Sequence, residues 1–475
     1  MGSPCSLNQG AIMQINTLCI SNKNTFKRVS QVALAVALAM GSAHAQGIFD
    51  QADIDFKGNV SSMGVVTPGS EATLQGRGFT PGQEVLLLSN GQSIVGDQKL
   101  VADKDGEFVS KTAIPASASV GLHPVVIQAA KPSAAAVFDL KISPKTEIVG
   151  TDLFTQQSAP MTRGLYQSAY SPKENKLYVV SSVGRPPVQQ SELLKVNPET
   201  LAIEARITPA ADPNRENHVY ALYGVSVDDV NGNIWVSTTR NNSVAVYKQS
   251  DLSLVKQFDD NTVAHSRDVV VDAANGRAYA SAFGGGEIAV FDTKTLEQLP
   301  SIELKSKGRQ APSPMSLALD TANQKLYTVS INTGEAFVVD LKEQKQENVI
   351  TLPQTRAASG VAVAPTEQLL WVAAQGTDNV LMIDLKNGEV VQDIKVGAGP
   401  LNIVWDDKNK LAFVAVRANG QVTALNAKGE VVANLEAGRQ PNHISTDGKG
   451  NLFVVHKAAS TDKDAVDQVT RLHMK

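Results

Sequence analysis

The stretch from Ser359 to Val396 reads SGVAVAP (359–365), LLWVA (369–373), DNVLMID (378–384) and EVVQDIKV (389–396), with turn-forming residues between the segments. Each segment is short and either apolar or alternating, which is the pattern of a β-strand. Four such strands joined by tight turns predict one antiparallel meander. Because this sheet is apolar on both faces, it needs copies of itself as neighbours to bury them.

An aromatic residue within a short apolar segment recurs along the chain. It occurs at Tyr178, Trp235, Tyr279, Tyr327, Trp371, Phe413 and Phe453, at intervals of 40 to 57 residues. Most intervals fit the period of about 40–50 residues expected for one four-stranded propeller blade. Polar, Pro-containing insertions at 184–190 and 209–217 lengthen the first interval. The sequence therefore predicts an all-β chain with a seven-bladed β-propeller at 146–475.

The last repeat ends at Lys475 after about three strands, whereas residues 146–154 precede the first repeat without partners of their own. A propeller removes its open edges when a strand from one end of the chain completes the blade at the other end. We therefore predict that 146–154 forms the outer strand of the last blade and closes the ring.

Residues 46–145 have a different pattern, with turn signals at 67–70, 76–82 and 103–106. These signals separate short alternating strands expected at 71–75, 84–89, 107–113, 123–129 and 137–142. Turns spaced by about 8–12 residues predict a small β-sandwich. The order of the motifs resembles bacterial immunoglobulin-like modules of cell-envelope proteins, which implies a spacer or adhesive unit.

The first 45 residues have the pattern of a secretory signal peptide. Basic residues at 23–28 precede an apolar run at 32–40 and an Ala-His-Ala site at 43–45. We predict cleavage after Ala45 and a periplasmic or secreted location, with no transmembrane segment elsewhere. The two cysteines, Cys5 and Cys19, precede the cleavage site. The processed chain is therefore expected to lack disulfides, thiolate chemistry and cysteine metal sites.

The repeats resemble the YVTN-repeat β-propellers, especially the secreted YncE-like group. Matching stretches lie at 242–247, 287–292 and 380–384, and the resemblance covers about 146–475. The exact Tyr-Val-Thr-Asn tetrad is absent, with Tyr178-Val179-Val180-Ser181 in its place. The resemblance implies a propeller fold and says little about function, because propellers host binding, scaffolding and several chemistries.

Basic residues concentrate in the connections that share one face of the expected propeller. Fourth-to-first-strand connections carry Arg163, His218, His265, Arg267, Arg309, Arg356 and Arg439, with His443 just beyond the last of them, and second-to-third-strand connections carry Arg185, Arg240, Arg417, His456 and Lys457. The opposite face takes mostly Asp and Glu. A single Arg at such a position is more often a structural brace or a solvated side chain. Together, however, guanidinium groups at a concave mouth focus positive potential and bind carboxylate or phosphate in forked pairs.

We therefore predict an anionic ligand, small or polymeric, or another envelope protein, bound at this mouth. The candidate residues are Arg163, Arg240, Arg267, Arg309, Arg356, Arg417, Arg439, His265 and His443. We predict no catalytic residue, metal or cofactor, because the sequence contains no nucleophile-elbow, zinc-protease or Walker motif. Two alternatives stay open: binding of single-stranded nucleic acid, which the net charge of −4 disfavours, and a lactonase-like or quinone-dependent propeller enzyme.

Overall fold

The computed structural model describes residues 52–457 and 466–475. The proposed leader, its cleavage site and both cysteines lie outside these ranges. Within them the regular structure is β-strand apart from two short 3₁₀ turns, at Thr151–Leu153 and Thr239–Asn241. None of the helical segments in the described part of the chain has the length and apolar character needed to span a membrane.

The first eight strands form two antiparallel sheets around one core. One sheet has the order β1-β2-β6 and the other β4-β3-β7-β8, with β5 paired to β3. The bounds are β1 (Asn59–Met63), β2 (Glu71–Arg77), β3 (Glu84–Ser89), β4 (Gln92–Ser93), β5 (Leu100–Val101), β6 (Phe108–Ala113), β7 (Gly121–Ala130) and β8 (Ala134–Ile142). Alternate side chains such as Leu74, Leu87 and Ile127 are buried between the sheets. The five strands expected in this region are confirmed.

The remaining strands of residues 52–457 and 466–475 form seven four-stranded antiparallel sheets. The first four sheets are β10 (Leu165–Ser171), β11 (Lys176–Val183), β12 (Gln190–Val196), β13 (Ile203–Ile207); β14 (Val225–Asp228), β15 (Asn233–Thr238), β16 (Ser243–Lys248), β17 (Leu254–Gln257); β18 (Ser266–Asp272), β19 (Arg277–Ala282), β20 (Glu287–Asp292), β21 (Gln298–Glu303); and β22 (Pro314–Asp320), β23 (Lys325–Ser330), β24 (Glu335–Asp340), β25 (Lys345–Thr351).

The other three sheets are β26 (Ala358–Ala364), β27 (Leu369–Ala374), β28 (Asn379–Asp384), β29 (Glu389–Lys395); β30 (Pro400–Asp406), β31 (Leu411–Val416), β32 (Gln421–Asn426), β33 (Val431–Glu436); and β34 (Pro441–Thr446), β35 (Asn451–His456), β36 (Gln468–Met474), β9 (Phe154–Pro160). The sheet β26–β29 confirms the meander predicted from Ser359–Val396.

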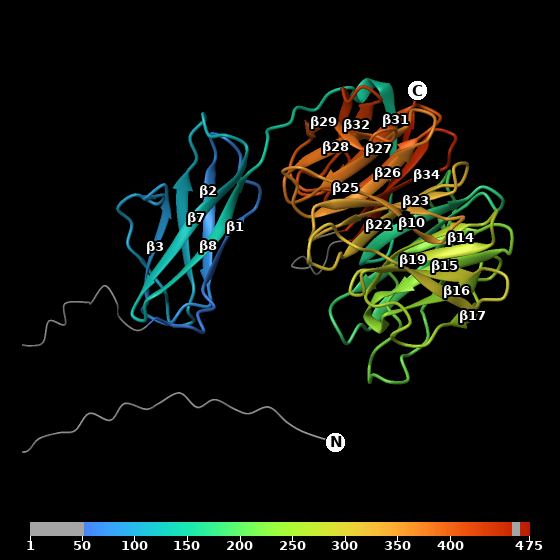
Figure 1. The fold of residues 1–475 in the computed structure, drawn as a ribbon, viewed down its shortest axis with the longest axis horizontal. Helices are drawn as coiled ribbons and strands as arrows, with labels where there is room; N and C mark the ends of the chain where they lie inside the picture. Colours follow the sequence, from blue (N-terminus) through green and yellow to red (C-terminus); the bar gives the residue numbers. More distant parts are fainter. Residues whose placement is uncertain (1–51, 458–465) are drawn as a thin grey trace, which may run out of the picture. The chain divides into compact units, whose positions relative to one another are not determined.

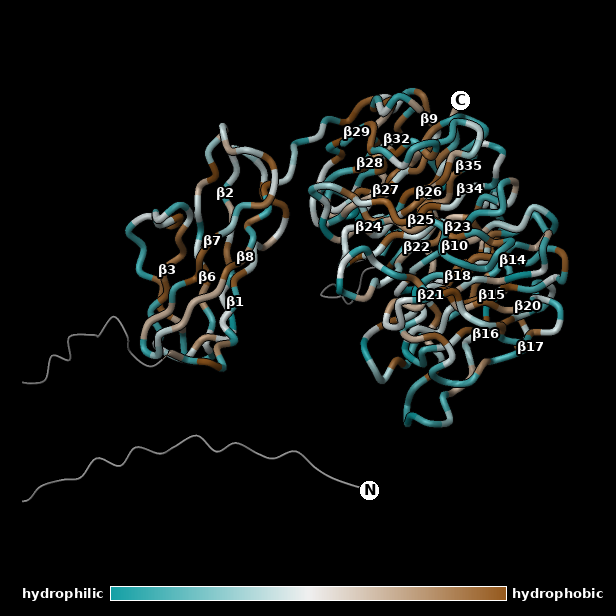
Figure 2. Tube along the Cα trace, viewed as in Figure 1, coloured by the Kyte–Doolittle hydropathy of each residue, from teal (hydrophilic) through white to brown (hydrophobic). Residues whose placement is uncertain are grey.

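The first strands of these sheets contact one another in order. Each of β10, β14, β18, β22, β26, β30 and β34 packs beside the next, and β34 returns to β10. They therefore line a closed central channel. The strands of one sheet follow one another outward, as β14 to β17 do in Figure 1. Apolar segments run along the strands, whereas the connections are mostly polar (Figure 2).

The recurring aromatic residue explains how neighbouring sheets adhere. In every sheet it is the third residue of the second strand, and it is buried. Trp235, for example, packs against the rings of Phe258 and Phe291, at centroid distances of 5.9 and 5.6 Å. Burying one large apolar side chain contributes about 1.5–3 kcal/mol, so the repeat supplies a comparable contact at each junction between sheets.

The strand that completes the last sheet lies further along the chain than predicted. It is β9, which pairs antiparallel with β36, so that Phe154 faces Met474 and Pro160 faces Gln468. The boundaries predicted for the closing strand, 146–154, were therefore wrong. Val149 instead exchanges backbone hydrogen bonds with Asn434 of β33, at 3.2 and 2.9 Å. The apolar residues before Phe154 led to the error, because an outermost strand is exposed on much of its surface and β9 is polar after its first residue.

Candidate functional site

Six of the seven first strands share an irregularity near one end of the channel. The register of β10 shifts between Leu165 and Gln167, and the register of β18 shifts between Ser266 and Val269. The strands β22, β26, β30 and β34 shift at the corresponding place. A bulge of this kind re-aims the side chain of the extra residue. In β10 the extra residue is Tyr166, and in β18 the bulge includes Arg267.

Next to these bulges, polar side chains that face the channel connect one first strand to the next through hydrogen bonds. Asp268 Oδ2 accepts the backbone N–H of Leu317 at 3.0 Å, and Gln167 Oε1 accepts the backbone N–H of Val225 at 3.1 Å. Burial raises the pKa of Asp268. The first strands enclose a cavity of about 330 Å³. Its polar groups are thus largely used to hold the ring together.

Two tyrosines form the centre of the channel mouth. The rings of Tyr166 and Tyr223 meet edge to face, with centroids 4.4 Å apart. Arg240 Nε donates a hydrogen bond to the Tyr223 hydroxyl at 3.1 Å. Lys457 Nζ lies 3.2 Å from the centroid of the Tyr166 ring, in a cation–π contact. Burial raises the pKa of Tyr166, so this ring stays a neutral platform at pH 7.

Two further cations, Arg267 and Arg417, act electrostatically on Tyr166 and on Lys457. Burial lowers the pKa of Arg417. Its Nη2 donates to Gln440 Oε1 at 3.4 Å, whereas its Nε is buried without a hydrogen-bond partner among the described residues. Within residues 52–457 and 466–475, no carboxylate lies within 4.0 Å of the side-chain nitrogens of these two arginines, Arg240 or Lys457. We call Arg240, Arg267, Arg417 and Lys457 the mouth cations.

Asp467 acts electrostatically on Lys457. Its Oδ2 accepts the backbone N–H groups of Gly164 and Leu165, at 2.6 and 2.9 Å. Gly164 has φ +83°, and a Cβ there would lie 2.4 Å from the Ser182 carbonyl oxygen, so the turn requires glycine. The Asp467 carboxylate thus fixes the loop that leads into Tyr166.

The predicted histidines lie close to the mouth cations. His443 lines the channel, and its Nδ1 accepts the backbone N–H of Ser168 at 3.4 Å. Burial, assisted by Arg267, lowers the pKa of His443 to about 3. His265 packs against the ring of Phe283 at 5.1 Å, and burial lowers its pKa as well. Both histidines are therefore neutral at pH 7. No group of three His, Cys, Asp or Glu side chains among the described residues is arranged to hold a metal.

The low pKa of His443 has a measurable effect on stability. An unfolded histidine, with a pKa of about 6.5, takes up a proton that the folded protein does not bind, so the free energy of unfolding falls as pH falls from about 6.5 toward 3. Between pH 7 and pH 5, we expect urea unfolding to show about 1–2 kcal/mol more loss for the wild type than for His443→Gln. His473→Gln, at an exposed histidine, is the control. Equal losses in all three proteins would contradict this assignment.

The other predicted arginines are spread around the same face. Arg163 is half-buried in the turn after β9, and Arg309 is exposed in the connection before β22. Arg356 forms an ion pair with Asp139. Arg439 is exposed and lines a separate depression of about 450 Å³ together with Arg417. The structure thus brings together Arg240, Arg267, Arg417, His265 and His443, and it gives Arg356 another partner.

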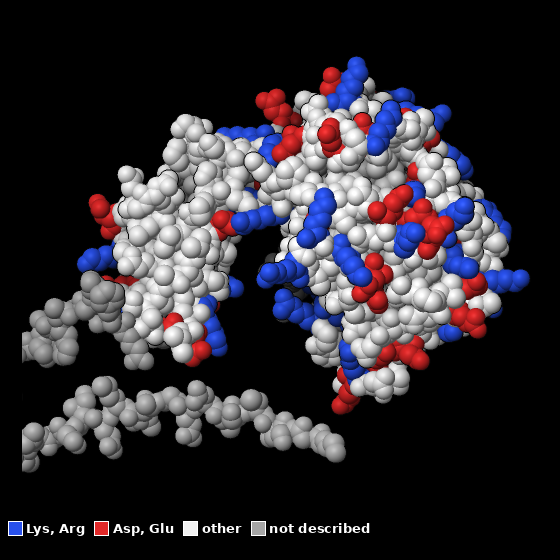
Figure 3. All heavy atoms as spheres, in the orientation of Figure 1, with Lys and Arg blue, Asp and Glu red and all other residues white. Residues whose placement is uncertain are grey.

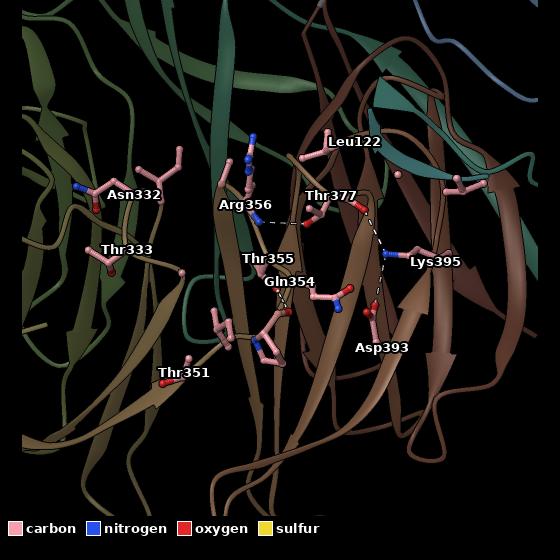
Figure 4. A pocket seen from close by; sticks show the side chains of 17 residues that line it. Leu122, Asn332, Thr333, Thr351, Gln354, Thr355, Arg356, Thr377, Asp393 and Lys395 are labelled. Carbon is pink, nitrogen blue, oxygen red and sulfur yellow. Dashed lines mark hydrogen bonds and ion pairs between the residues drawn. The ribbon is translucent and has the colours of Figure 1, made fainter. Parts of the chain in front are cut away.

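A wider pocket of about 1020 Å³ includes Arg356 and the ends of the strands of two adjacent sheets. Figure 4 shows Lys395 between Thr377 and Asp393 there. Lys395 Nζ lies 3.7 Å from Asp393 Oδ1, and the Arg356 backbone N–H donates to Thr377 Oγ1 at 3.3 Å. Both cations of this pocket, Arg356 and Lys395, already face carboxylates. An anion would therefore find less uncompensated positive charge here than at the channel mouth.

The acidic residues expected on the opposite face have structural roles. Asp272 Oδ2 accepts a hydrogen bond from Asn275 Nδ2 at 2.7 Å, and Asp320 accepts the corresponding bond from Asn323 at 2.8 Å. Such Asx interactions stabilise the tight turns between first and second strands. On the side of the molecule drawn in Figure 3, acidic and basic side chains are interspersed.

Sequence reasoning missed Tyr166. It placed Lys457 in a connection on the basic face but did not include it among the candidate ligands. The position of Tyr166 within its repeat could have identified it as a site residue. Tyr166 occupies the same irregular segment of β10 as Arg267 occupies in β18.

The family model of the cytochrome D1 heme domain matches residues 243–468. A haem iron needs an axial ligand such as His, Cys, Met or Tyr and room for the macrocycle. His443 lines a cavity of only about 330 Å³, and the raised pKa of Tyr166 disfavours the phenolate that would ligate iron. The mouth itself presents arginine and lysine. These residues do not fit a haem site, so the match concerns the fold.

Relatives identified by sequence are YncE proteins. The YncE protein of Salmonella typhi is 25% identical over 321 residues, which are 64% of this chain and 86% of that protein. The YncE protein of Escherichia coli strain K12 is 23% identical over 341 residues, 68% of this chain and 92% of that protein.

Solved structures agree on the architecture at lower identity. The virginiamycin B lyase from Staphylococcus aureus superposes with a TM-score of 0.54 at 14% identity, covering 68% of this chain and 100% of that one. Hydrazine synthase from Kuenenia stuttgartiensis gives a TM-score of 0.53 at 14% identity, over 62% and 93%. At these identities the likeness concerns the fold alone. The sheets, the sequence relatives and the structural neighbours agree that this chain is a β-propeller protein similar to YncE.

Proposed function

We propose that the protein is an exported binding protein of the cell envelope, in which a seven-bladed propeller follows an immunoglobulin-like sandwich and binds an anionic ligand at the channel mouth. The observation that carries the proposal is the cluster of mouth cations, Arg240, Arg267, Arg417 and Lys457. They surround Tyr166 and lack a carboxylate partner among the described residues. The basic, apolar and Ala-x-Ala segments within 1–45 support export.

The energetics favour a bound anion at this place. Partly buried cations that face one another repel, and each has lost part of its hydration. An anion between them offsets both costs, and the unpartnered Arg417 Nε supplies a hydrogen-bond donor for it. Guanidinium groups bind carboxylate or phosphate in forked pairs. The ligand class is therefore a compact carboxylate or phosphate, seated on the tyrosine pair.

Of the nine residues predicted from the sequence, we propose Arg240, Arg267 and Arg417 as direct ligands, joined by Lys457. His265 and His443 border them as neutral groups. Arg163, Arg309, Arg356 and Arg439 contribute to the positive potential of the same face. Long-range potential of this kind raises the association rate of an anion more than it raises affinity.

The triple variant Arg240→Gln, Arg267→Gln, Arg417→Gln tests the site. Citrate and inorganic phosphate are titrated into the full chain by isothermal calorimetry. A hydrogen bond to a charged group contributes about 1.5–3 kcal/mol, so we expect affinity to fall about tenfold or more for each arginine removed. Arg309→Gln removes the same charge from an exposed position on the same face and should leave affinity within about twofold.

Two results would reject the proposal. One is unchanged affinity in the triple variant, provided that circular dichroism shows the wild-type fold. The other is selective binding of single-stranded oligonucleotides with a strong length and salt dependence, which would indicate a nucleic-acid surface instead. A compact anion competes without any length dependence.

A further inference from the structure

Lys457 differs in its surroundings from an ordinary exposed lysine. It follows β35 directly, and its backbone N–H donates to the Gln440 carbonyl at 3.1 Å. Its side chain is half-buried, and the amine lies 3.2 Å from the Tyr166 ring centroid. Lys345, by comparison, is exposed and lies 3.8 Å from the Glu343 carboxylate. Lys457 is thus held in place by its backbone and by an aromatic ring.

The charged groups around the Lys457 amine are Arg417, Arg267 and Arg240, with Asp467 as the acidic neighbour. Burial, followed by the repulsion from these arginines, lowers the pKa of Lys457 to about 7, although Asp467 acts in the opposite direction. A larger share of these amines is therefore neutral at pH 7 than in a lysine with the ordinary pKa of about 10.4, which is almost fully protonated. Only the neutral amine has a free electron pair.

We propose that Lys457 is a nucleophile that forms an imine with the carbonyl carbon of an anion held by Arg240, Arg267 and Arg417. The ligand class is a 2-oxo carboxylate, in which the reactive carbon is directly bonded to the charged group. This inference rests on the anionic site proposed above and adds a covalent step to it. Lysines become nucleophilic by desolvation or by a neighbouring cation, and Lys457 has both.

The step is balanced without any further reagent. The amine nitrogen attacks the carbonyl carbon, a C–N bond forms, and the electron pair of the C=O π bond moves to oxygen. Proton transfer gives a neutral carbinolamine. Loss of the oxygen as water, together with the second amine hydrogen, leaves the C=N bond. Carbonyl compound and amine thus give imine and water, with no oxidation or reduction.

The geometry favours this ligand over an anion that has no carbonyl group. The arginines proposed to bind the carboxylate act on Tyr166, and the ring of Tyr166 also holds the Lys457 amine, 3.2 Å from its centroid. A carbonyl carbon bonded directly to the carboxylate therefore needs the shortest reach to that amine.

Reductive trapping in the full chain tests the inference. Protein is incubated at pH 7 with pyruvate or with its neutral methyl ester, in the presence of cyanoborohydride, and the lysine adducts are mapped by peptide mass spectrometry. With pyruvate we expect Lys457 to be labelled about tenfold or more faster than Lys345. The ester should label Lys457 several-fold less, because the arginines have no charge to bind. Arg417→Gln should shift the pH midpoint of Lys457 labelling upward, since it removes a cation beside the amine.

Lys457→Arg removes the nucleophile, so the adduct at position 457 should be lost while labelling of Lys345 stays unchanged. Lys345→Arg should leave trapping at Lys457 unchanged. Labelling of Lys457 no faster than of Lys345, in protein that still binds citrate, would overturn the imine and leave the anion site intact. Equal labelling by pyruvate and by its ester, together with no citrate binding, would overturn both proposals.

Discussion

Replacing Phe154–Pro160 with a Gly/Ser segment of the same length is expected to lower the midpoint of thermal unfolding by about 5 °C or more. These seven residues pair with Gln468–Met474 along their whole length. Their loss removes several backbone hydrogen bonds, each contributing about 0.5–1.5 kcal/mol, and leaves β36 as an open edge. In a chain of this length, 1 kcal/mol corresponds to roughly 1–2 °C. Differential scanning calorimetry and light scattering measure both consequences.

The control is the same replacement at 146–150. This segment has one β-bridge to β33, through Val149, and side-chain hydrogen bonds at Thr146 and Glu147, but its removal opens no sheet. A decrease of about 2 °C or less is expected. If the replacement at 146–150 proved as damaging as the replacement at 154–160, closure by β9 would not be what holds the ring together.

Trp371→Ala is expected to lower the free energy of unfolding by about 3–5 kcal/mol, the usual cost of truncating a large buried aromatic residue. Trp371 is fully buried and stacks on Trp405 with ring centroids 6.3 Å apart. Trp371 lies at the junction of two sheets, so its truncation to alanine leaves a cavity in the interface between them. Chemical denaturation monitored by circular dichroism gives the value.

Trp371→Phe is the matched variant. Trp371 Nε1 is buried without a hydrogen-bond partner among the described residues, so phenylalanine removes an unsatisfied donor along with part of the ring. Phe413 and Phe453 already occupy the same position of their repeats. We expect a loss of about 1.5 kcal/mol or less. Equal losses for Ala and Phe would mean that the recurring aromatic residue does not act through packing.

The repeated sheets were predictable because one physical requirement recurs in each of them. Every second strand is buried on both faces and must place a large ring at the same register, as Tyr178, Trp235 and Trp371 do. A requirement that is repeated at intervals becomes visible in a single sequence, even though no two repeats share many residues.

The closing strand was not located correctly because outer strands obey no such requirement. In β9 only Phe154 is buried, and the residues after it are mostly exposed. Because these residues are nearly all polar, the segment lacks the alternation of apolar and polar residues by which a strand is predicted. The apolar Ile148 and Val149 attracted the prediction, yet both are about 40% exposed, at 39% and 41%. Pairing with a strand at the other end of the chain decides the position, and this information is not local.

The candidate site was likewise predictable only in part. Arginines in connections were assigned to one face from blade topology, and Arg240, Arg267 and Arg417 do lie together. Which arginines converge depends on the bulges in the first strands and on Tyr166, and neither follows from residue type. Arg356 was grouped with them, although its guanidinium pairs with Asp139. Lys457 became distinctive only through its contact with the Tyr166 ring.

The pairing of β9 with β36 also determines the order of events during biosynthesis. Ser158 and Thr470, whose hydroxyls lie 2.9 Å apart, are separated by 312 positions. During synthesis β9 leaves the ribosome long before β36 and has no partner until β36 has followed it. Early sheets can form in sequence, but the ring stays open until β36 is available. A nascent chain that lacks β36 therefore carries β9 as an unpaired strand.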